Sequence, residues 1–497
     1  MEQAGNSNKK SNTIQAFWVV LGSFSSLALG MVSAAILSRY FEKEEYGTYK
    51  QILYVYTTLL VIFSAGLPRV YSYFLPRYNI SEGKNIVRKV TWVLFLGGLL
   101  FSAFLFIFSG FIAHILKNPE LERGLKVFSP IPMLLLPTLG IEGIFSTYKR
   151  TVFIAIYNTI TRVLMLLFIV LPVILFKGSY ITAIYGWLAV SLISLLIAVH
   201  FKNIPFKTVQ PKNTTLTYHN IFAYSLPLLA ASLWGIAIKT ADQFYVSRYF
   251  GAEVFAEFSN GFIELPFVAM ITAATSTVLM PVFTKIMHGK EGLDELSSIW
   301  KSALVKSAII IYPLVIFFIF FAKEAVILLY SNRYENSAIY FQINMILNFF
   351  NIIIFAPLLF AMGKTKFYSR LHMFLAIAVW GTDYLVLLIF NSPVAIAITS
   401  VLLAIVKILI SMLYVSKILE TSLLSLFPVK KIMLIIIHGF ISIILIKAIL
   451  YFLPIHTLII NLILGSILYL TVLLSTARIF KLDYFVVIKP LLNKIKK

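Results

Sequence analysis

Unbroken apolar runs of about 20 residues recur along this chain and constrain its fold more than any other feature. Each run is long enough to cross the hydrocarbon core of a bilayer as a helix. The runs fall near residues 13–37, 48–66, 91–112, 128–147, 152–175, 180–200, 221–246, 256–281, 302–322, 338–362, 368–390, 394–415, 433–453 and 457–476. Their continuity argues against a β-barrel, whose strands alternate apolar and polar residues. The sequence therefore predicts an all-α polytopic membrane protein with about 14 transmembrane helices.

The composition excludes a soluble protein of this size. Only 12% of the 497 residues are charged and 60% are hydrophobic, whereas soluble domains carry about 25% charged residues. No connection between runs much exceeds about 20 residues, which leaves no room for an extramembrane catalytic domain. Because the chain contains no cysteine, disulfides, thiolate catalysis and cysteine-ligated metals are excluded.

The basic residues behind the net charge of +22 are distributed unevenly between the two sides of the membrane that the spans predict. If the N-terminus is cytoplasmic, 27 lysines and arginines fall on the cytoplasmic side, 10 on the outer side and 5 within the membrane. Cytoplasmic loops of membrane proteins carry this kind of positive excess. We therefore expect both termini in the cytoplasm and no nucleic-acid partner.

An internal repeat links the two halves of the chain. SRYF at 38–41 recurs at 247–250, and the offset between matching positions drifts only from 209 to about 205 across the flanking residues. Six predicted helices separate the copies, so both halves have the same orientation, an arrangement known in transporters. The repeat predicts an N-terminal six-helix bundle at 1–210, a second at 211–425, and two further helices with a basic cytoplasmic tail at 426–497. A chance match of four residues remains the alternative.

Short motifs in a fixed order carry a likeness to a known family. They are LSRYF at 37–41, EYGTY at 45–49, GLP at 66–68, DQF at 242–244, SRYFG at 247–251 and LMPVF at 279–283. In order and spacing the chain resembles the polysaccharide transporter family, of the Wzx type that includes the O-antigen flippases. This family belongs to the multidrug/oligosaccharidyl-lipid/polysaccharide exporter superfamily.

The resemblance implies a fold and a function. Two six-helix bundles would form a central cavity that opens alternately to each side of the membrane. Through it, undecaprenyl-diphosphate-linked oligosaccharide would be flipped across the inner membrane for O-antigen or capsule synthesis. The first helix departs from the lipid II flippases of the superfamily, because it carries no lysine or arginine within its span. This departure favours a lipid-linked glycan other than the peptidoglycan precursor.

Arg162 is the most informative charge inside the predicted membrane region. It lies about 11 residues into its helix, roughly 16 Å deep, where an unpaired charge costs a few kcal/mol. Asn158 lies one turn earlier and extends a polar face. The guanidinium matches the geometry of a diphosphate in a cavity, and an interhelical ion pair is the alternative.

Three charges lie near the expected cavity in the second half of the chain. Lys239 and Asp242 are three residues apart on one helical face, so they either neutralise each other or form a cation switch. In the second case Asp242 takes up a proton or sodium ion and releases Lys239 to the substrate. Glu264, beside Pro266 within the predicted helix 256–281, is a second candidate for cation coupling.

Four arginines stand at the predicted mouths of the transport path. Arg39 and Arg248 occupy equivalent outer positions of the repeat, where they contact either lipid headgroups or the diphosphate late in transport. Arg69 and Arg77 follow the second helix on the cytoplasmic side and are candidates for attracting the diphosphate during loading.

Two other functions compete with a glycan flippase. A membrane polysaccharide polymerase or ligase needs a convergent acid, base or metal set, whereas the seven histidines are scattered and no Gly-rich phosphate loop is present. A cation-coupled multidrug exporter of the same superfamily would favour acidic over cationic cavity residues. The sequence therefore predicts a monomeric transporter, not an enzyme, with no catalytic residues, cofactor or metal site and with membrane lipid around it.

Overall fold

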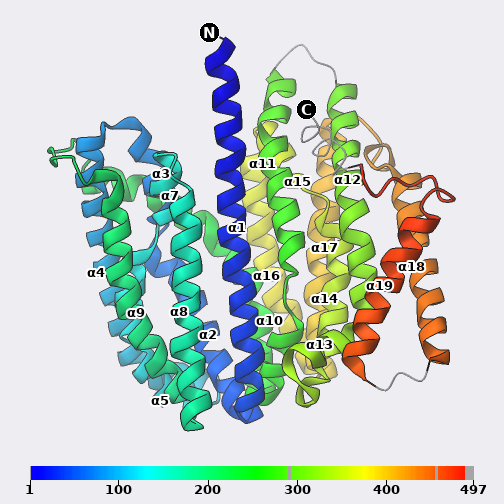
Figure 1. Cartoon of the computed structure of the whole chain (residues 1–497), viewed down its shortest axis with the longest axis horizontal. Coiled ribbons are helices and arrows are strands. Elements are labelled where there is room, and N and C mark those ends of the chain that lie inside the picture. Colours follow the sequence, from blue (N-terminus) through cyan, green and yellow to red (C-terminus); the bar gives the residue numbers. More distant parts are fainter. Residues whose placement is uncertain (1, 289–292, 454–456, 487–497) are drawn as a thin grey trace. The chain divides into compact units, whose positions relative to one another are not determined.

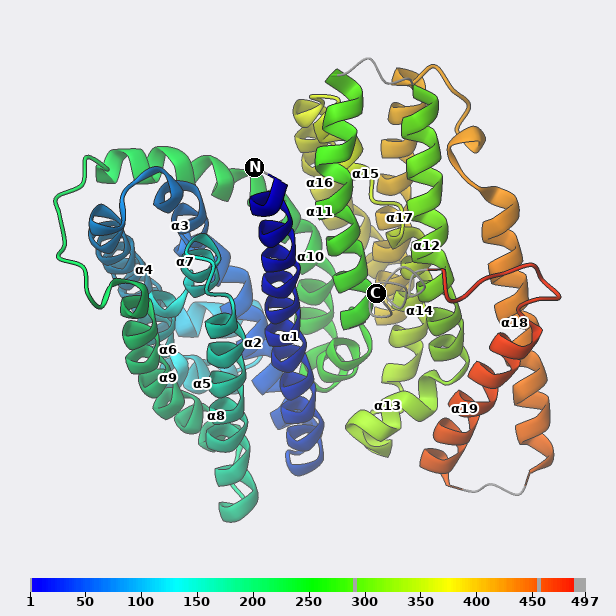
Figure 2. The same ribbon diagram turned by 45° about the horizontal axis from the view of Figure 1, so that its top comes forward.

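The computed structural model describes residues 2–288, 293–453 and 457–486. The basic tail predicted beyond residue 486 lies outside them. In the described part of the chain, 14 helical segments are long and apolar enough to cross a membrane, and each overlaps one of the predicted runs. The prediction of an all-α polytopic membrane protein is therefore confirmed. Figure 1 and Figure 2 show the helices of both parts of the chain.

The chain divides into two compact units, Met1–Ala256 and Glu257–Lys497. The division falls within α10, which the repeat assigned to the second bundle from residue 211 onwards. The bundle boundary at residue 210 was inferred from the repeat and stays a prediction. By contacts alone, α10 belongs to the first unit as far as Ala256.

The first unit consists of helices of very different length. Its elements are α1 (Glu2–Tyr40), α2 (Lys43–Ser64), α3 (Pro68–Phe74), α4 (Ile80–Ile115), α5 (Glu120–Phe128), α6 (Ile131–Leu135), α7 (Ile141–Thr147), α8 (Val152–Phe176), α9 (Tyr180–Asn203) and α10 (Tyr218–Gly261). Short 3-10 helices follow α3, α6 and α9, at Leu75–Arg77, Leu136–Thr138 and Ile204–Phe206. Helix α8 packs between α1 and α9.

The second unit contains the remaining helices. They are α11 (Pro266–His288), α12 (Leu293–Phe320), α13 (Ala322–Tyr330), α14 (Ser337–Asn351), α15 (Phe355–Ala361), α16 (Thr365–Phe390), α17 (Pro393–Ile418), α18 (Val429–Phe452) and α19 (Leu458–Thr476). Helix α12 contacts α11, α14 and α18, and α18 packs beside α19, as the orange and red ribbons of Figure 2 show.

Several predicted spans are interrupted helices. The span predicted at 128–147 consists of α5, α6 and α7, because prolines remove backbone donors there and Gly140 adopts a left-handed φ of 87°. A Cβ at Gly140 would lie 2.2 Å from the ring of Tyr71 on α3, so only glycine allows these segments to approach so closely. These breaks place backbone and polar groups at membrane depth where they line a cavity.

The two copies of the repeated motif share a structural break. Helix α1 ends at Tyr40, directly before Phe41, and α2 begins at Lys43. At the matching place in the second copy, Gly251 interrupts α10 with φ 82° and ψ 179°. An offset of 209 carries Glu42 onto Gly251, so the same local break follows both SRYF sequences. This agreement supports the repeat over a chance match.

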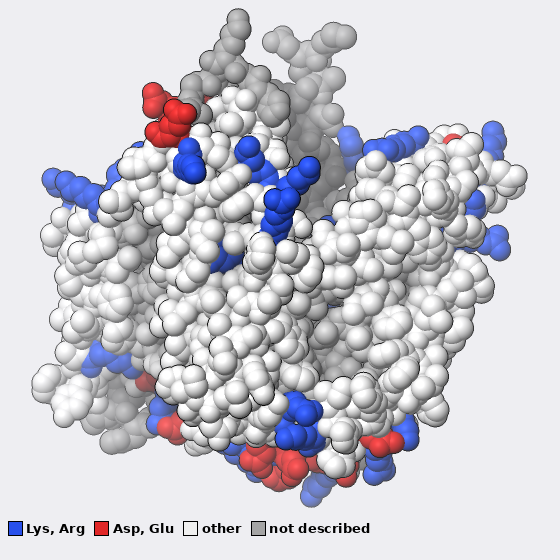
Figure 3. Space-filling model, turned by 180° about the vertical axis from the view of Figure 1, so that it is seen from behind, with Lys and Arg blue, Asp and Glu red and all other residues white. Residues whose placement is uncertain are grey.

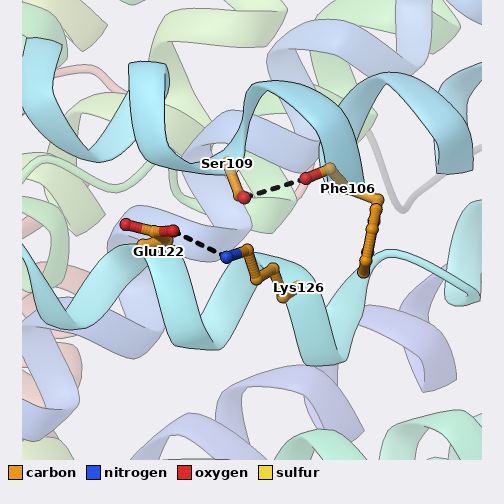
Figure 4. Close-up of polar contacts among 4 residues, drawn as sticks. All are labelled: Phe106, Ser109, Glu122 and Lys126. Carbon is orange, nitrogen blue, oxygen red and sulfur yellow. Dashed lines mark hydrogen bonds and ion pairs between the residues drawn. The ribbon is translucent and has the colours of Figure 1, made fainter.

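Charged side chains of the surface mostly lie towards the ends of the spanning helices, as Figure 3 shows for one face. The ends of α4 and α5 give an example in Figure 4. Lys126 and Glu122 of α5 form an ion pair of 2.7 Å, and the hydroxyl of Ser109 donates to the Phe106 carbonyl within α4. Polar groups inside the apolar band satisfy one another locally in this way.

Candidate functional site

A cavity of about 870 Å³ lies within the first unit and provides the candidate site. Its walls come from α1, α2, α3, the α6–α7 segment, α8 and α9. The polar and charged groups that line it are Ser26, Tyr56, Thr57, Arg69, Ser72, Thr138, Glu142, Ser146, Tyr157, Asn158, Thr161, Arg162 and Ser194. Hydroxyl groups, two arginines and one carboxylate therefore converge on one space inside an otherwise apolar bundle.

Arg162 on α8 points its guanidinium into this cavity. Its Nε donates to the hydroxyl of Ser26 on α1 at 3.0 Å, and Nη1 lies 3.7 Å from the sulfur of Met165. Among the described residues no carboxylate forms an ion pair with Arg162, so the interhelical ion pair considered from the sequence is not formed. Serine fixes one edge of the guanidinium and leaves the remaining donors available to a ligand.

A smaller cavity of about 160 Å³ adjoins Arg162. It is lined by α1, α2, α8 and α9 and includes Lys50, whose ammonium lies 5.2 Å from the centre of the Tyr46 ring. Lys50 is one of the 10 cations that the expected topology assigns to the outer side, but it belongs to α2. A polar stripe of Tyr46, Lys50 and Thr57 at helical spacing was the available signal for this position.

Asn158 forms part of the same polar face as Arg162, as predicted. Its side-chain amide donates to a carboxylate oxygen of Glu142 on α7 at 3.3 Å. The hydroxyl of Thr161 instead donates to the Tyr157 carbonyl at 2.8 Å within α8. Glu142 is thus engaged by a neutral amide, and the cationic character of the cavity comes from its arginines.

Arg69 and Arg77 differ in position although the sequence grouped them. Arg69 on α3 is exposed and lines the 870 Å³ cavity. Arg77 does not line it. Its guanidinium stacks 3.7 Å from the centre of the Tyr73 ring, and Tyr73 stacks on Tyr224 of α10 at 3.9 Å. Only Arg69 joins Arg162 at the candidate site.

Arg39 lies in the last turn of α1 and Arg248 lies inside α10, just before its break at Gly251, and neither lines this cavity. Arg39 is exposed and donates to the Ala35 carbonyl at 2.6 Å. Arg248 donates to the Ile115 carbonyl, at the C-terminus of α4, where a cation satisfies an unpaired helix carbonyl and the helix dipole. This contact gives Arg248 a structural role.

Lys239 and Asp242 lie on α10 and do not line the cavity. Lys239 is exposed, whereas only 4% of Asp242 is exposed. One Asp242 oxygen accepts from the backbone amide of Gln243 at 2.7 Å. Whether these two residues neutralise each other or switch with a cation stays a prediction.

Glu264 lies in the break between α10 and α11, so its predicted place inside a continuous helix at 256–281 is wrong. Pro266 begins α11, and proline both lacks a backbone donor and disfavours helical geometry in the preceding residue. The side-chain amide of Asn344 donates to the Ile263 carbonyl within this break at 2.6 Å. Glu264 is exposed and lines a pocket of about 390 Å³ in the second unit, together with Asn348 and Asn351.

Lys202 is a buried cation that hydropathy and spacing do not reveal. It is one of the 27 cations that the expected topology assigns to the cytoplasmic side, yet it lies in the last turn of α9 and only 3% of it is exposed. Its ammonium donates to the Pro137 carbonyl at 2.7 Å and to the hydroxyls of Tyr71 and Thr91 at 3.2 Å. No sequence pattern around Lys202 predicts its burial, because its oxygen partners come from three segments far away in the sequence.

Two kinds of relative share features with this chain. The succinoglycan biosynthesis transport protein ExoT of Rhizobium meliloti (strain 1021) is 25% identical over 293 residues, which cover 57% of this chain and 56% of ExoT. Among solved structures, the lipid II flippase MurJ in an inward closed conformation matches with a TM-score of 0.69 at 15% identity, covering 93% of this chain and 99% of MurJ. An inward-facing multidrug resistance MATE transporter of the MOP superfamily matches with a TM-score of 0.65 at 12% identity, covering 80% and 98%. At these identities the structural matches show the fold alone.

A family model settles the relationship at the level of sequence. The model described as "Polysaccharide biosynthesis protein" matches residues 36–339. This range covers more than half of the chain and includes α2 to α13 and the described lining of the candidate cavity except Ser26. The chain therefore belongs to this family of polysaccharide biosynthesis proteins.

Proposed function

We propose that this protein flips undecaprenyl-diphosphate-linked oligosaccharide across the bacterial inner membrane, by alternating access, for the synthesis of a surface polysaccharide of the O-antigen or capsule type. The observation that carries the proposal is the 870 Å³ cavity with Arg162 free of any described carboxylate partner. An unpaired guanidinium in a membrane-embedded cavity is costly unless it serves an anion.

The cavity chemistry suits both parts of such a headgroup. The fork of Arg162 matches two phosphate oxygens, and Arg69 adds a second cation that extends along the same cavity. The hydroxyls of Ser26, Tyr56 and Thr161, with the amide of Asn158, are suitable partners for sugar hydroxyls. The lipid tail needs no pocket, because it stays in the bilayer during transport.

A counter-ion is part of the proposal. Asp242 and Glu264 are the candidate carboxylates for proton or sodium coupling, one buried in α10 and the other exposed in the pocket beside α11. Both termini face the cytoplasm in this scheme, since the positive excess of the chain lies on that side. The protein acts as a monomer.

A drug exporter and a membrane enzyme are less well supported. An exporter of cationic drugs needs carboxylates in its cavity, but Glu142 already accepts from Asn158 and two arginines outnumber it. Among the described residues no group of three or more His, Asp or Glu side chains forms a metal site.

The decisive experiment measures flipping in proteoliposomes loaded with a fluorescent diphosphate-linked oligosaccharide lipid. Arg162→Gln should slow flipping roughly ten- to hundredfold, the range expected for lost hydrogen bonds to a charged group. Lys177→Gln is the matched control, because it removes one charge from an exposed position at the end of the same helix. The proposal fails if the wild-type protein does not flip the lipid, or if both variants flip it at the wild-type rate.

A further inference from the structure

A second large cavity of the first unit lies apart from the candidate site. It measures about 960 Å³ and opens between the beginning of α4 and the end of α9, which Figure 1 and Figure 2 show side by side. Its lining shares no residue with the 870 Å³ cavity. The transport function proposed above therefore does not account for it.

Cations dominate the polar lining of this second cavity. Lys84, Arg88 and Lys89 contribute from the first three turns of α4, and Lys202 from the last turn of α9. None of the described residues that line it is acidic. Four like charges in one pocket repel one another unless an anion is bound among them.

Lys202 is held in the wall of the pocket by hydrogen bonds. Its side chain is 97% buried, yet all of its hydrogen-bond partners, the oxygens of Pro137, Tyr71 and Thr91, are neutral. Thr91 and Pro137 line the same cavity. No described carboxylate compensates this buried ammonium, so a nearby anion would stabilise it.

The segment 207–217 forms a fixed wall of the pocket. The Lys84 ammonium donates to the carbonyls of Phe206 and Val209 at 3.3 and 2.8 Å. Lys89 donates to the Leu216 carbonyl at 3.1 Å, and its ammonium lies 5.7 Å from the centre of the Tyr218 ring. Arg88 is exposed and forms no ion pair with a described residue. The pocket is thus preformed, with at least one cation directed to solvent or ligand.

The remaining wall is apolar and aromatic. Trp92 and Val199 are 54% and 44% exposed, and Phe95 and Leu195 lie beside them. Tryptophan and tyrosine at such positions occupy the interface between headgroups and acyl chains. A ligand of this pocket therefore combines an anionic group with an apolar chain.

We propose that this pocket binds an anionic phospholipid of the surrounding bilayer. Its phosphate lies among Arg88, Lys89 and Lys202, and its acyl chain runs along Trp92 and Val199 towards the membrane. Basic pockets between transmembrane helices bind anionic headgroups by this chemistry. The bound lipid tethers α4 to α9 and neutralises the buried lysine.

The test uses delipidated full-length protein in a neutral detergent and native mass spectrometry. The probes are dioleoyl phosphatidylglycerol and dioleoyl phosphatidylcholine, which differ only in the headgroup. Wild-type protein should bind the phosphatidylglycerol about tenfold more tightly, and Arg88→Gln/Lys89→Gln should lose roughly ten- to thirtyfold of that affinity. The control Lys366→Gln/Arg370→Gln removes two exposed charges from the first turns of α16 and should change it by less than about twofold.

Three outcomes overturn the proposal. Equal weakening in both double variants shows non-specific attraction, and equal binding of the two lipids shows that charge is not recognised. Competition by glycerol phosphate at the lipid's own concentration identifies a free phosphate as the ligand.

If the double variant does not fold, Arg88→Glu replaces it, because the exposed Arg88 has no hydrogen bond or ion pair to lose among the described residues. Flipping activity is not a readout, so the two proposals succeed or fail separately.

Discussion

The 870 Å³ cavity of the first unit and the 390 Å³ pocket of the second unit carry different polar groups. In the first unit, Arg162 and Arg69 line the large cavity and Glu142 is occupied by an amide. In the second unit, the pocket beside α11 contains Glu264 with Asn348 and Asn351, and none of its described lining residues is basic. The repeat thus preserved the local helix breaks while the polar side chains diverged. Under the proposed function, we assign the anion site to the first of these two pockets and the coupling cation to the second.

One lysine of each unit shows a second difference, although Lys202 is buried and the Lys447 side chain is 32% exposed. Lys202 in the first unit is held by neutral oxygens alone, whereas Lys447 in the second forms a 3.0 Å ion pair with Glu324 and lies 3.7 Å from the centre of the Phe321 ring. The carboxylate of Glu324 compensates the charge of Lys447, which therefore needs no external anion. A lysine without one, in a pocket of further cations, retains affinity for an external anion.

Charge reversal at Arg162 should lower the flipping rate more than any other substitution considered. Arg162→Glu places a carboxylate in the anion site, so flipping should fall by more than about a hundredfold, beyond the loss in Arg162→Gln. The measurement is initial flipping rate at matched protein density in the liposomes. Equal rates for the glutamate and glutamine variants would show that charge at this position does not matter.

The pair Arg69 and Arg77 sharpens the boundary of the anion site. Arg69→Gln should reduce flipping about three- to tenfold, less than Arg162→Gln, because the Arg162 guanidinium is oriented by Ser26 and that of Arg69 has no such partner among the described residues. Arg77→Gln should change the rate by less than about twofold, since its guanidinium stacks on Tyr73 outside the cavity. The reverse order of effects would place the loading site at Arg77 instead.

The cation side of the contrast depends on Glu264. Glu264→Gln should leave the rate without an ion gradient within about twofold and abolish its acceleration by an imposed proton or sodium gradient. Asp242→Asn tests the alternative carboxylate in the same assay. Gradient dependence that survives both substitutions would remove these residues from coupling.

The smallest effect concerns the carboxylate of the anion site. Glu142→Gln keeps a hydrogen-bond acceptor for Asn158 but removes the negative charge, so the headgroup should bind about two- to threefold more tightly. The half-saturating concentration of the diphosphate lipid in the flipping assay measures this change. A weaker apparent affinity would mean that Glu142 contacts the sugar directly.

The spans were predictable because hydropathy is a local property. Each of the 14 spans of the described chain overlaps a predicted run, since about 20 apolar residues suffice to cross a bilayer whatever their neighbours. The interruptions were less predictable. Pro266 ended the expected helix at 256–281 and moved Glu264 into a connecting segment, although proline occurs inside α8, α10 and α12 without ending them. A break at membrane depth also needs partners for the backbone groups that it exposes, and here the Asn344 amide bonds the Ile263 carbonyl.

By itself the sequence determined the all-α membrane fold, the order of the spans, the repeat and the polar face around Arg162. Only the tertiary structure decided which polar groups meet: Arg69 joins Arg162, Arg77 and Arg248 do not, and Lys50 and Lys202 move from loops into the bundle. The physical reason is the range of the forces involved. Apolar transfer free energy adds up along a contiguous segment, whereas a site requires contacts among helices far apart in the chain.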